Sequence, residues 1–201
     1  MAQKTRMDEL MVSVRRHDWR NNTVDEHVCW EEPDTDLIFY PEFVVPFGKD
    51  MKLRSKVPLY TLDETGLTAD EIIEQAKKNM AMRAKCYFMS EVFTELFGGD
   101  DFVDYVPDIV VITTPDKSHG AGAIASTEIL DQAKEMLGGG DIYIIPSSIH
   151  ECLAVPADAL DDINGLINII NEINGSLVAP HEQLSDHPYL WDGVHLRTVA
   201  A

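Results

Sequence analysis

The clearest pattern of hydrophobic and polar positions in this chain is a pair of short apolar runs joined by a compact polar turn. Ile142 to Ile145 is a β-branched and aromatic run, and Cys152 to Val155 is apolar again. Runs of this length are typical of strands, and a short polar connection between them is typical of a hairpin. The connection carries a group of reactive side chains, which we expect to emerge at one end of a sheet: Ser147, Ser148, His150 and Glu151.

Three other segments have the pattern of strands. Residues 108–114, DIVVITT, form a continuous β-branched run of the kind found inside sheets. Residues 57–62 alternate loosely between apolar and polar positions, and residues 195–199 look like a closing strand.

Helical spacing of apolar residues marks the remaining regular segments. Thr68 and Glu71 have the spacing of a capping box, which predicts the start of a helix. The apolar residues that follow predict two helices, or one that is broken near Cys86. Further amphipathic stretches predict helices that begin at Thr127 and at a cap on Asp158. Together these elements predict an α+β fold, with a mixed, mainly antiparallel sheet and helices packed on it.

Residues 1–56 have the least regular pattern. Asp8 to Arg16 places apolar residues at helical spacing and predicts a short helix. Two apolar runs, residues 37–40 and 43–45, are split by Pro41, which favours an edge strand or a bent one. We therefore divide the chain into an irregular N-terminal extension, residues 1–56, and an acidic α+β domain, residues 57–201.

The loop after residues 108–114 contains Gly120 and Gly122 and precedes a predicted helix. Glycine loops at helix starts can bind phosphate groups through backbone amides. Here the third glycine of the dinucleotide pattern and the Gly-Lys-Ser/Thr ending of the P-loop are both missing. We therefore expect no cofactor, and we expect the small residues to allow a close approach to a neighbouring strand.

Charge narrows the range of partners. The chain of 201 residues is 45% hydrophobic, enough for a core, and has a formal net charge of −19. Residues 58–201 hold 7 basic and 24 acidic side chains, which leaves −17 on that part. Such a surface repels phosphate backbones, so we expect no direct nucleic-acid binding and consider a basic protein partner, although solubility alone also explains the acidity. The basic residues that cluster, interpreted as a solvated loop, are Lys49, Lys52, Arg54 and Lys56.

The cysteines and the apolar runs indicate the cellular location of the protein. Cys29, Cys86 and Cys152 are widely spaced and odd in number, which fits reduced thiols better than disulfides or structural zinc. No apolar run approaches the roughly 18 residues of a membrane span, and the charged N-terminal segment is unlike a signal peptide. We expect a cytoplasmic protein without membrane contact.

Two sets of residues have the composition of catalytic sites. The first set has the residue types of a nucleophile, a base and an orienting acid: Ser147 or Ser148, with His150 and Asp186. Histidine and carboxylate side chains also form mixed ligand sets for zinc, manganese or iron. The candidate ligands for such a metal are His150, Glu151, Asp186 and His187.

A structural role explains the same residues. Ser147 and Ser148 can bond backbone groups in a turn, and Ser185 with Asp186 can orient His187. In that interpretation Glu151 satisfies a half-buried His150, and the residues hold the hairpin against the C-terminal segment. The structural role is the one we favour, so we assign no catalytic, cofactor-binding or metal-binding residue.

Several of these motifs resemble a known family. PSSIHE at residues 146–151, LSDH at residues 184–187 with Tyr189, and VAPHEQLSDH from Val178 are similar to a bacterial family of unknown function, found in gut Gram-positive bacteria and their mobile elements. The resemblance covers roughly residues 57–197, whereas residues 1–57 match poorly. It implies a cytoplasmic α+β domain without an established activity.

Our functional expectation is therefore a non-enzymatic, acidic domain that works through protein contacts in a bacterium, a phage or a mobile element. One alternative is an anti-defence inhibitor that imitates nucleic acid and binds a basic nucleic-acid-handling protein. The other is a small metal-dependent or serine hydrolase at the His150 and His187 region. An open sheet edge would also allow a homo-oligomer.

Overall fold

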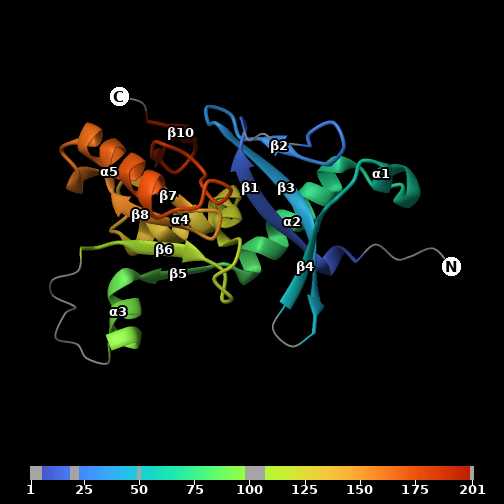
Figure 1. Cartoon of the computed structure of the whole chain (residues 1–201), viewed down its shortest axis with the longest axis horizontal. Helices are drawn as coiled ribbons and strands as arrows, with labels where there is room; N and C mark the ends of the chain where they lie inside the picture. The colour runs from blue at the N-terminus through green and yellow to red at the C-terminus, as the bar shows by residue number, and fades with distance from the viewer. Residues whose placement is uncertain (1–5, 19–22, 49–50, 98–106, 200–201) are drawn as a thin grey trace.

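The computed structural model describes residues 6–18, 23–48, 51–97 and 107–199, and it contains helices and antiparallel sheets in an α+β arrangement (Figure 1). The described strands form a four-stranded sheet and a six-stranded sheet, and all their pairings are antiparallel. The α+β class is confirmed. The single mixed sheet that the sequence suggested is instead two antiparallel sheets.

The first sheet is built by the N-terminal part of the chain. β3 is its central strand and pairs with each of the others. The strands are β1 (Leu10–Arg16), β2 (Trp30–Glu31), β3 (Leu37–Phe47) and β4 (Met51–Lys56), after a 3-10 turn at Met7–Glu9. The described residues of the expected irregular extension therefore form a sheet. The division of the chain into domains at residue 57 stays a prediction.

The expected helix at Asp8 to Arg16 is wrong, because Asp8 and Glu9 belong to a 3-10 turn and the rest of the segment is β1. Leu10, Val12 and Val14 are all buried. These side chains alternate along a strand and pack on one face of the sheet, so a period of two fits the segment as well as helical spacing did.

Pro41 lies inside the central strand and not at a sheet edge. On one side of β3 it stands opposite Val12 of β1. On the other side, β2 pairs with residues 38–39 and β4 with residues 42–47, so Pro41 falls in the gap between them. The interrupted ladder explains how a residue without an N–H is accommodated in a central strand.

The second sheet has the order β10-β9-β7-β8-β6-β5. Its centre is the predicted hairpin, β7 (Ile142–Ser148) and β8 (Glu151–Pro156), beside β6 (Val110–Thr113). β5 (Lys85–Phe88), β9 (Tyr189–Trp191) and β10 (Leu196–Thr198) complete it. The strands at residues 108–114 and 195–199 are confirmed, while β5 and β9 were not predicted, because runs this short carry little periodic signal.

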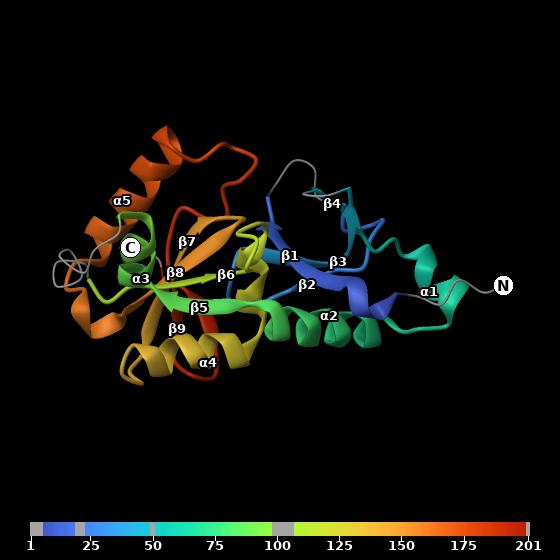
Figure 2. The same cartoon turned by 90° about the horizontal axis from the view of Figure 1, so that it is seen from below.

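Helices cover the sheets from two sides. Figure 2 shows α2 and α4 along one side of the molecule and α5 on the other. The helices are α1 (Tyr60–Thr65), α2 (Ala69–Arg83), α3 (Met89–Phe97), α4 (Thr127–Met136) and α5 (Ile163–Ser176), with 3-10 turns η3 (Gly120–Ala125) and η4 (Ala157–Ala159).

The predicted starts of two helices are confirmed, and two other predictions need correction. The capping box at Thr68 and Glu71 is present, and α4 begins at Thr127. Residues 60–65 form a helix where we expected a strand, ended by Gly66 in the left-handed conformation. α5 is capped by Asp162, whose side chain accepts from the amide of Gly165, and not by Asp158, which lies in η4.

The glycine-rich turn η3 lies between the two sheets, and its small residues allow a close approach to neighbouring strands, as we expected. A Cβ on Gly122 would lie 2.2 Å from the carbonyl oxygen of Val12 in β1. A Cβ on Gly120 would lie 2.4 Å from the Thr113 Oγ1 of β6. These contacts close the gap between the sheets, and one hydrophobic core cluster includes residues of both.

Candidate functional site

The PSSIHE motif forms the end of the β7–β8 hairpin and is bonded to its surroundings through His150. The amide of His150 donates to Ser148 Oγ at 3.1 Å, so Ser148 bonds the turn as expected. The carbonyl oxygen of His150 accepts from Thr113 Oγ1 at 2.8 Å and from the amide of Gly120 at 2.9 Å. The tip of the hairpin is thereby bonded to β6 and to η3.

Both ring nitrogens of His150 have partners within the protein. Nδ1 accepts from the amide of His119 at 3.2 Å, and Nε2 lies 3.3 Å from Glu182 Oε1. Since Nδ1 accepts, the ring proton is on Nε2 and is donated to Glu182. The partner of His150 is therefore Glu182, and not the adjacent Glu151 that we expected. His150 lies in the turn between the strands, whereas Glu151 is the first residue of β8, and the fold brings Glu182 to the ring from a later segment.

His119, which contacts His150, is held in an unusual environment. Its backbone is left-handed, with φ of 55°, and its ring lies edge-on to His150 with 5.3 Å between centroids. Burial, together with the nearby cations Arg54 and Arg15, lowers the pKa of His119 to about 3. This imidazole is neutral at physiological pH.

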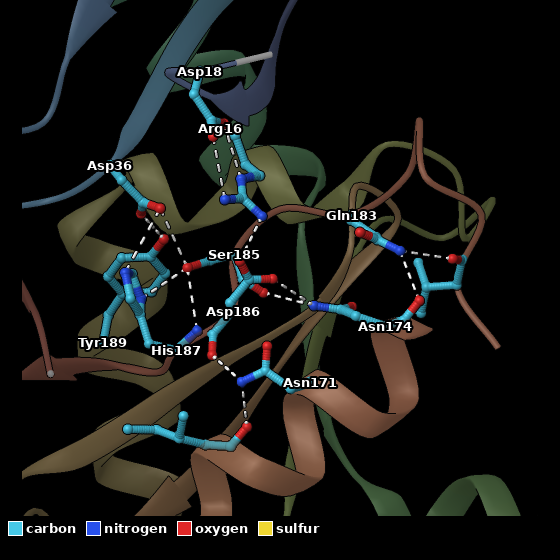
Figure 3. Close-up of polar contacts among 12 residues, drawn as sticks. Arg16, Asp18, Asp36, Asn171, Asn174, Gln183, Ser185, Asp186, His187 and Tyr189 are labelled. Atoms are coloured by element: carbon cyan, nitrogen blue, oxygen red, sulfur yellow. Dashed lines mark hydrogen bonds and ion pairs between the residues drawn. The ribbon is translucent and has the colours of Figure 1, made fainter. Parts of the chain in front are cut away.

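The LSDH motif lies in the segment between α5 and β9, and its Ser185 and His187 converge on Asp36 of the first sheet's β2–β3 connection (Figure 3). Ser185 Oγ is 2.7 Å from His187 Nδ1 and 3.4 Å from Asp36 Oδ2. His187 Nε2 is 3.6 Å from the same Asp36 oxygen. Tyr189 donates its hydroxyl to the other oxygen of Asp36. We call Asp36, Ser185, His187 and Tyr189 the Asp36 network.

The protonation of Tyr189 suits its role as a donor. Burial and the neighbouring Asp36 carboxylate raise the pKa of Tyr189. The phenol therefore stays protonated and can donate to the carboxylate at any physiological pH.

Asp186 turns away from the Asp36 network and binds a different part of the first sheet. Its Oδ2 lies 2.9 Å from Arg16 Nη1 at the end of β1, and Arg16 also pairs with Asp18 at 3.0 Å (Figure 3). Asn174 of α5 donates to the carbonyl oxygen of Ser185 at 2.9 Å and to Asp186 Oδ1 at 3.4 Å. The segment is thus bonded on one side to the first sheet and on the other to α5.

The structure does not assemble the residues of the predicted hydrolytic site. His150 is bonded to Glu182, whereas Asp186 is paired with Arg16, so the two do not form a base and its orienting acid. Ser148 bonds the amide of His150 and not its ring. Ser147 and Glu151 are half-buried residues at the ends of β7 and β8.

The candidate metal ligands are divided in the same way. His150 and His187 have separate carboxylate partners, Glu182 and Asp36. In the part of the chain that the structure describes, no group of three or more histidine, cysteine, aspartate or glutamate side chains is placed to hold a metal ion.

The Asp36 network contains a serine, a histidine and an aspartate in contact, a set that the sequence did not reveal. Residue 36 lies 149 positions from residue 185, so only the fold brings them together. Ser185 is fully buried, with 0% exposure, and its hydroxyl faces His187 and Asp36. A nucleophile must reach a substrate carbonyl, so in this conformation the arrangement holds the segment in place and does not present an attacking oxygen.

The three cysteines have raised pKa values, which keep their thiols protonated. All three are free thiols, as the sequence indicated. Burial raises the pKa of Cys86 to about 11 and raises the pKa values of Cys29 and Cys152 as well. A thiol that stays protonated is a poor nucleophile.

Taken together, the fold and the two motifs define an α+β domain in which LSDH residues bond to the first sheet, while PSSIHE residues bond the hairpin to β6, η3 and Glu182. The chain belongs to the family described as "Family of unknown function (DUF5688)", whose model matches residues 17–193. The match begins directly after β1 and includes β2, β3 and β4, so the expectation that residues 1–57 match poorly is wrong for residues 17–57. Neither a curated protein nor a solved structure matches the chain significantly.

Proposed function

We propose that this chain is a non-enzymatic protein-interaction domain, and that the β3–β4 ribbon is the surface that binds the partner. The observation that carries the proposal is an exposed apolar face at a sheet edge. Phe47, Met51 and Leu53 are 52%, 62% and 52% exposed. Large apolar side chains gathered on an accessible surface are typical of sites that bind other proteins.

The register of the ribbon places these residues on one face. Phe47 stands opposite Met51, and Val45 stands opposite Leu53. Side chains of directly paired residues in an antiparallel ladder point to the same face, so the apolar residues form a continuous surface. Among the described strands β4 pairs with β3 alone, which leaves its outer edge open to a further strand.

The internal bonding of the two signature motifs supports a non-enzymatic role. Ser185 is buried, and both ring nitrogens of His150 are bonded within the protein. Groups used in this way connect segments of the fold and have no free position for a substrate.

The charge of the chain, most of which lies on residues 58–201 and not on the ribbon itself, supports a basic partner through long-range attraction. Its formal net charge is −19, and complementary charge accelerates association and favours partners of opposite sign. The same acidity favours a second candidate, an inhibitor that imitates nucleic acid and occupies the binding face of a nucleic-acid-handling protein.

We further propose a bacterial cytoplasmic setting, in a cell, a phage or a mobile element. The three free cysteines support it, because cytosolic thiols are kept reduced. None of the described helices is both long enough and apolar enough to cross a membrane.

The test compares capture of proteins from a bacterial host lysate by the wild type, by Leu53→Lys and by Leu177→Lys. Leu177 is 81% exposed at the end of α5 and provides a matched control. We expect a basic protein that the wild type and Leu177→Lys retain and that Leu53→Lys loses, since a lysine on an edge strand opposes both apolar docking and strand addition. Mass spectrometry identifies it, and purified components give the affinity.

The purified pair then separates the candidates. Binding that weakens steeply with salt and competes with DNA indicates the nucleic-acid mimic, while binding that DNA leaves unchanged indicates an ordinary protein contact. Light scattering of the two variants provides the counter-test. A wild-type dimer that Leu53→Lys dissociates would assign the ribbon to self-association, and identical capture by all three proteins would remove the ribbon as a docking surface.

A further inference from the structure

A hollow of about 440 Å³ lies where the two sheets meet, and its walls are basic. The side chains that give it this character are Lys52, Arg54, Arg83 and Lys85. They come from β4, from the end of α2 and from the start of β5. Four of the 16 basic side chains of a strongly acidic protein therefore surround one small volume.

The acidic groups near the hollow do not neutralise it. Asp116 is the one carboxylate among its described lining residues, and it is already paired with Lys52 and bonded by Thr114 Oγ1 at 2.8 Å. Arg54 lies 3.6 Å from the buried Glu42. Two carboxylates thus stand against four cations.

The other two cations are held without a counter-ion. Arg83 donates to the carbonyl oxygen of Asp8 at 2.8 Å and contacts Met11 Sδ at 3.3 Å. In the described part of the chain, neither Arg83 nor Lys85 has a carboxylate within ion-pair distance. Positive charge at a concave surface lowers the energy of a bound anion more than the same charge on a flat one.

Arg54 is positioned before any ligand arrives. Its side chain is 16% exposed, and its Nη2 donates to the carbonyl oxygen of Ser118 at 3.1 Å. A guanidinium fixed in this way loses little conformational freedom when it bonds an anion.

The hollow also has apolar walls. Met11 and Val44 line it from the first sheet and are almost fully buried, and Met82 lines it from α2. A site that combines fixed cations with apolar surface suits a ligand that has an anionic group attached to an apolar body. Its volume lies within the range of roughly 300–1,000 Å³ that is usual for small-molecule sites.

We propose that this hollow is a binding site for a small organic phosphate, with the phosphate among the four cations and the organic part against the methionines. Guanidinium groups match phosphate geometry through paired N–H donors, and lysines add charge. Because the cations come from both sheets, the ligand bridges them and stabilises the folded state.

The site is separate from the proposed partner surface, although both use β4. Lys52 and Arg54 stand opposite Pro46 and Val44, whereas Met51 and Leu53 stand opposite Phe47 and Val45. The two sets alternate along the strand and so lie on opposite faces of the ribbon. Failure of one proposal leaves the other intact.

Isothermal titration with phenyl phosphate, inorganic phosphate and phenol tests the site in the full chain. We expect phenyl phosphate to bind most tightly, inorganic phosphate weakly and phenol not measurably. Lys85→Gln should weaken phenyl phosphate about tenfold, the usual effect of one charge-assisted contact. Lys78→Gln, an exposed lysine of α2 outside the hollow, is the matched control and should bind as the wild type does.

A second variant and a second measurement guard against an effect on folding. Arg83→Gln should weaken binding similarly, and its circular dichroism and melting temperature report whether the loss of the Asp8 contact has altered the fold. The proposal is overturned if phenyl phosphate fails to bind at millimolar concentration, if phenol binds equally well, or if folded Lys85→Gln and Lys78→Gln bind alike.

Discussion

Asp36 shows how a residue outside any motif can organise the contacts of a motif. It receives Ser185, His187 and Tyr189 from a segment about 150 positions away in the sequence. A buried hydroxyl or imidazole that loses its partner pays the cost of desolvation without compensation. The Asp36 network is therefore a polar connection between the first sheet and the segment that leads into β9.

Replacing Ser185 tests this role at the level of one hydroxyl. Ser185→Ala should lower the free energy of unfolding by about 1–2 kcal/mol, because His187 and Asp36 each lose a buried partner. Ser176→Ala is the control: its hydroxyl is exposed on α5, and the change should stay within about 0.5 kcal/mol. Urea unfolding measures both, and equal values for the two variants would contradict a stabilising role.

The lowered pKa of His119 predicts how the stability of the fold depends on pH. Its pKa is about 3 in the folded protein and lies near its usual value of 6.5 when unfolded. As the pH falls below 6.5, the unfolded chain takes up a proton that the folded chain does not, so stability is lost between pH 6.5 and pH 3. His119→Asn removes this titration and tolerates the left-handed backbone.

The measurement is urea unfolding of the wild type and of His119→Asn at several values of pH from 7 to 4. The wild type should lose on the order of 1–2 kcal/mol more than the variant over this range, a figure reduced for the partial exposure of the ring. The carboxylates titrate in both proteins, so the difference isolates His119. Parallel pH profiles would show that the ring takes up its proton equally in both states.

At the scale of elements, η3 is the piece that lets two sheets share a core. Its glycines face the backbone of β1 on one side and of β6 on the other. A side chain at either glycine would clash with these strands, because their nearest atoms already lie at contact distance. The element is recognisable in the sequence as a glycine-bearing loop, but the apolar spacing of its neighbour β1 predicts a short helix.

Gly122→Ala should therefore be severely destabilising, by about 3 kcal/mol or more, since the new methyl group would overlap the carbonyl oxygen of Val12. Gly175→Ala is the control. Gly175 lies in α5 with open space around it, so alanine should raise stability by about 0.5–1 kcal/mol through helix propensity. Thermal unfolding reports both, and an unchanged melting temperature for Gly122→Ala would show that β1 and η3 are not closely packed.

At the scale of the whole molecule, the hydrophobic core spans both sheets, whereas the negative charge is concentrated in one part of the chain. The hydrophobic core runs through both sheets, from Leu10 and Phe39 in the first to Ile112 and Ile144 in the second. The acidity lies mainly in residues 58–201, whereas the cations of the hollow come from both parts. A ligand that binds there would act on the relative position of the sheets, because its contacts span them.

The sequence alone determined the elements that depend on residues close together in the chain. The capping box at Thr68, the hairpin around residues 142–156 and the buried strand at residues 110–113 were all predictable, because side chains within a few positions decide them. The contact in which the Ser185 hydroxyl orients His187 was predictable for the same reason, since the two residues are close in the sequence.

Only the tertiary structure decided which distant groups meet. Leu10 to Arg16 is a strand because β3 pairs with it, and nothing within the segment distinguishes that from a short helix. His150 contacts Glu182, which is 32 positions away in the sequence, and Asp186 pairs with Arg16, which is 170 positions away. Such partners depend on how the sheets pack and not on spacing along the chain, so a list of reactive side chains suggested a catalytic site where the fold uses them as connections.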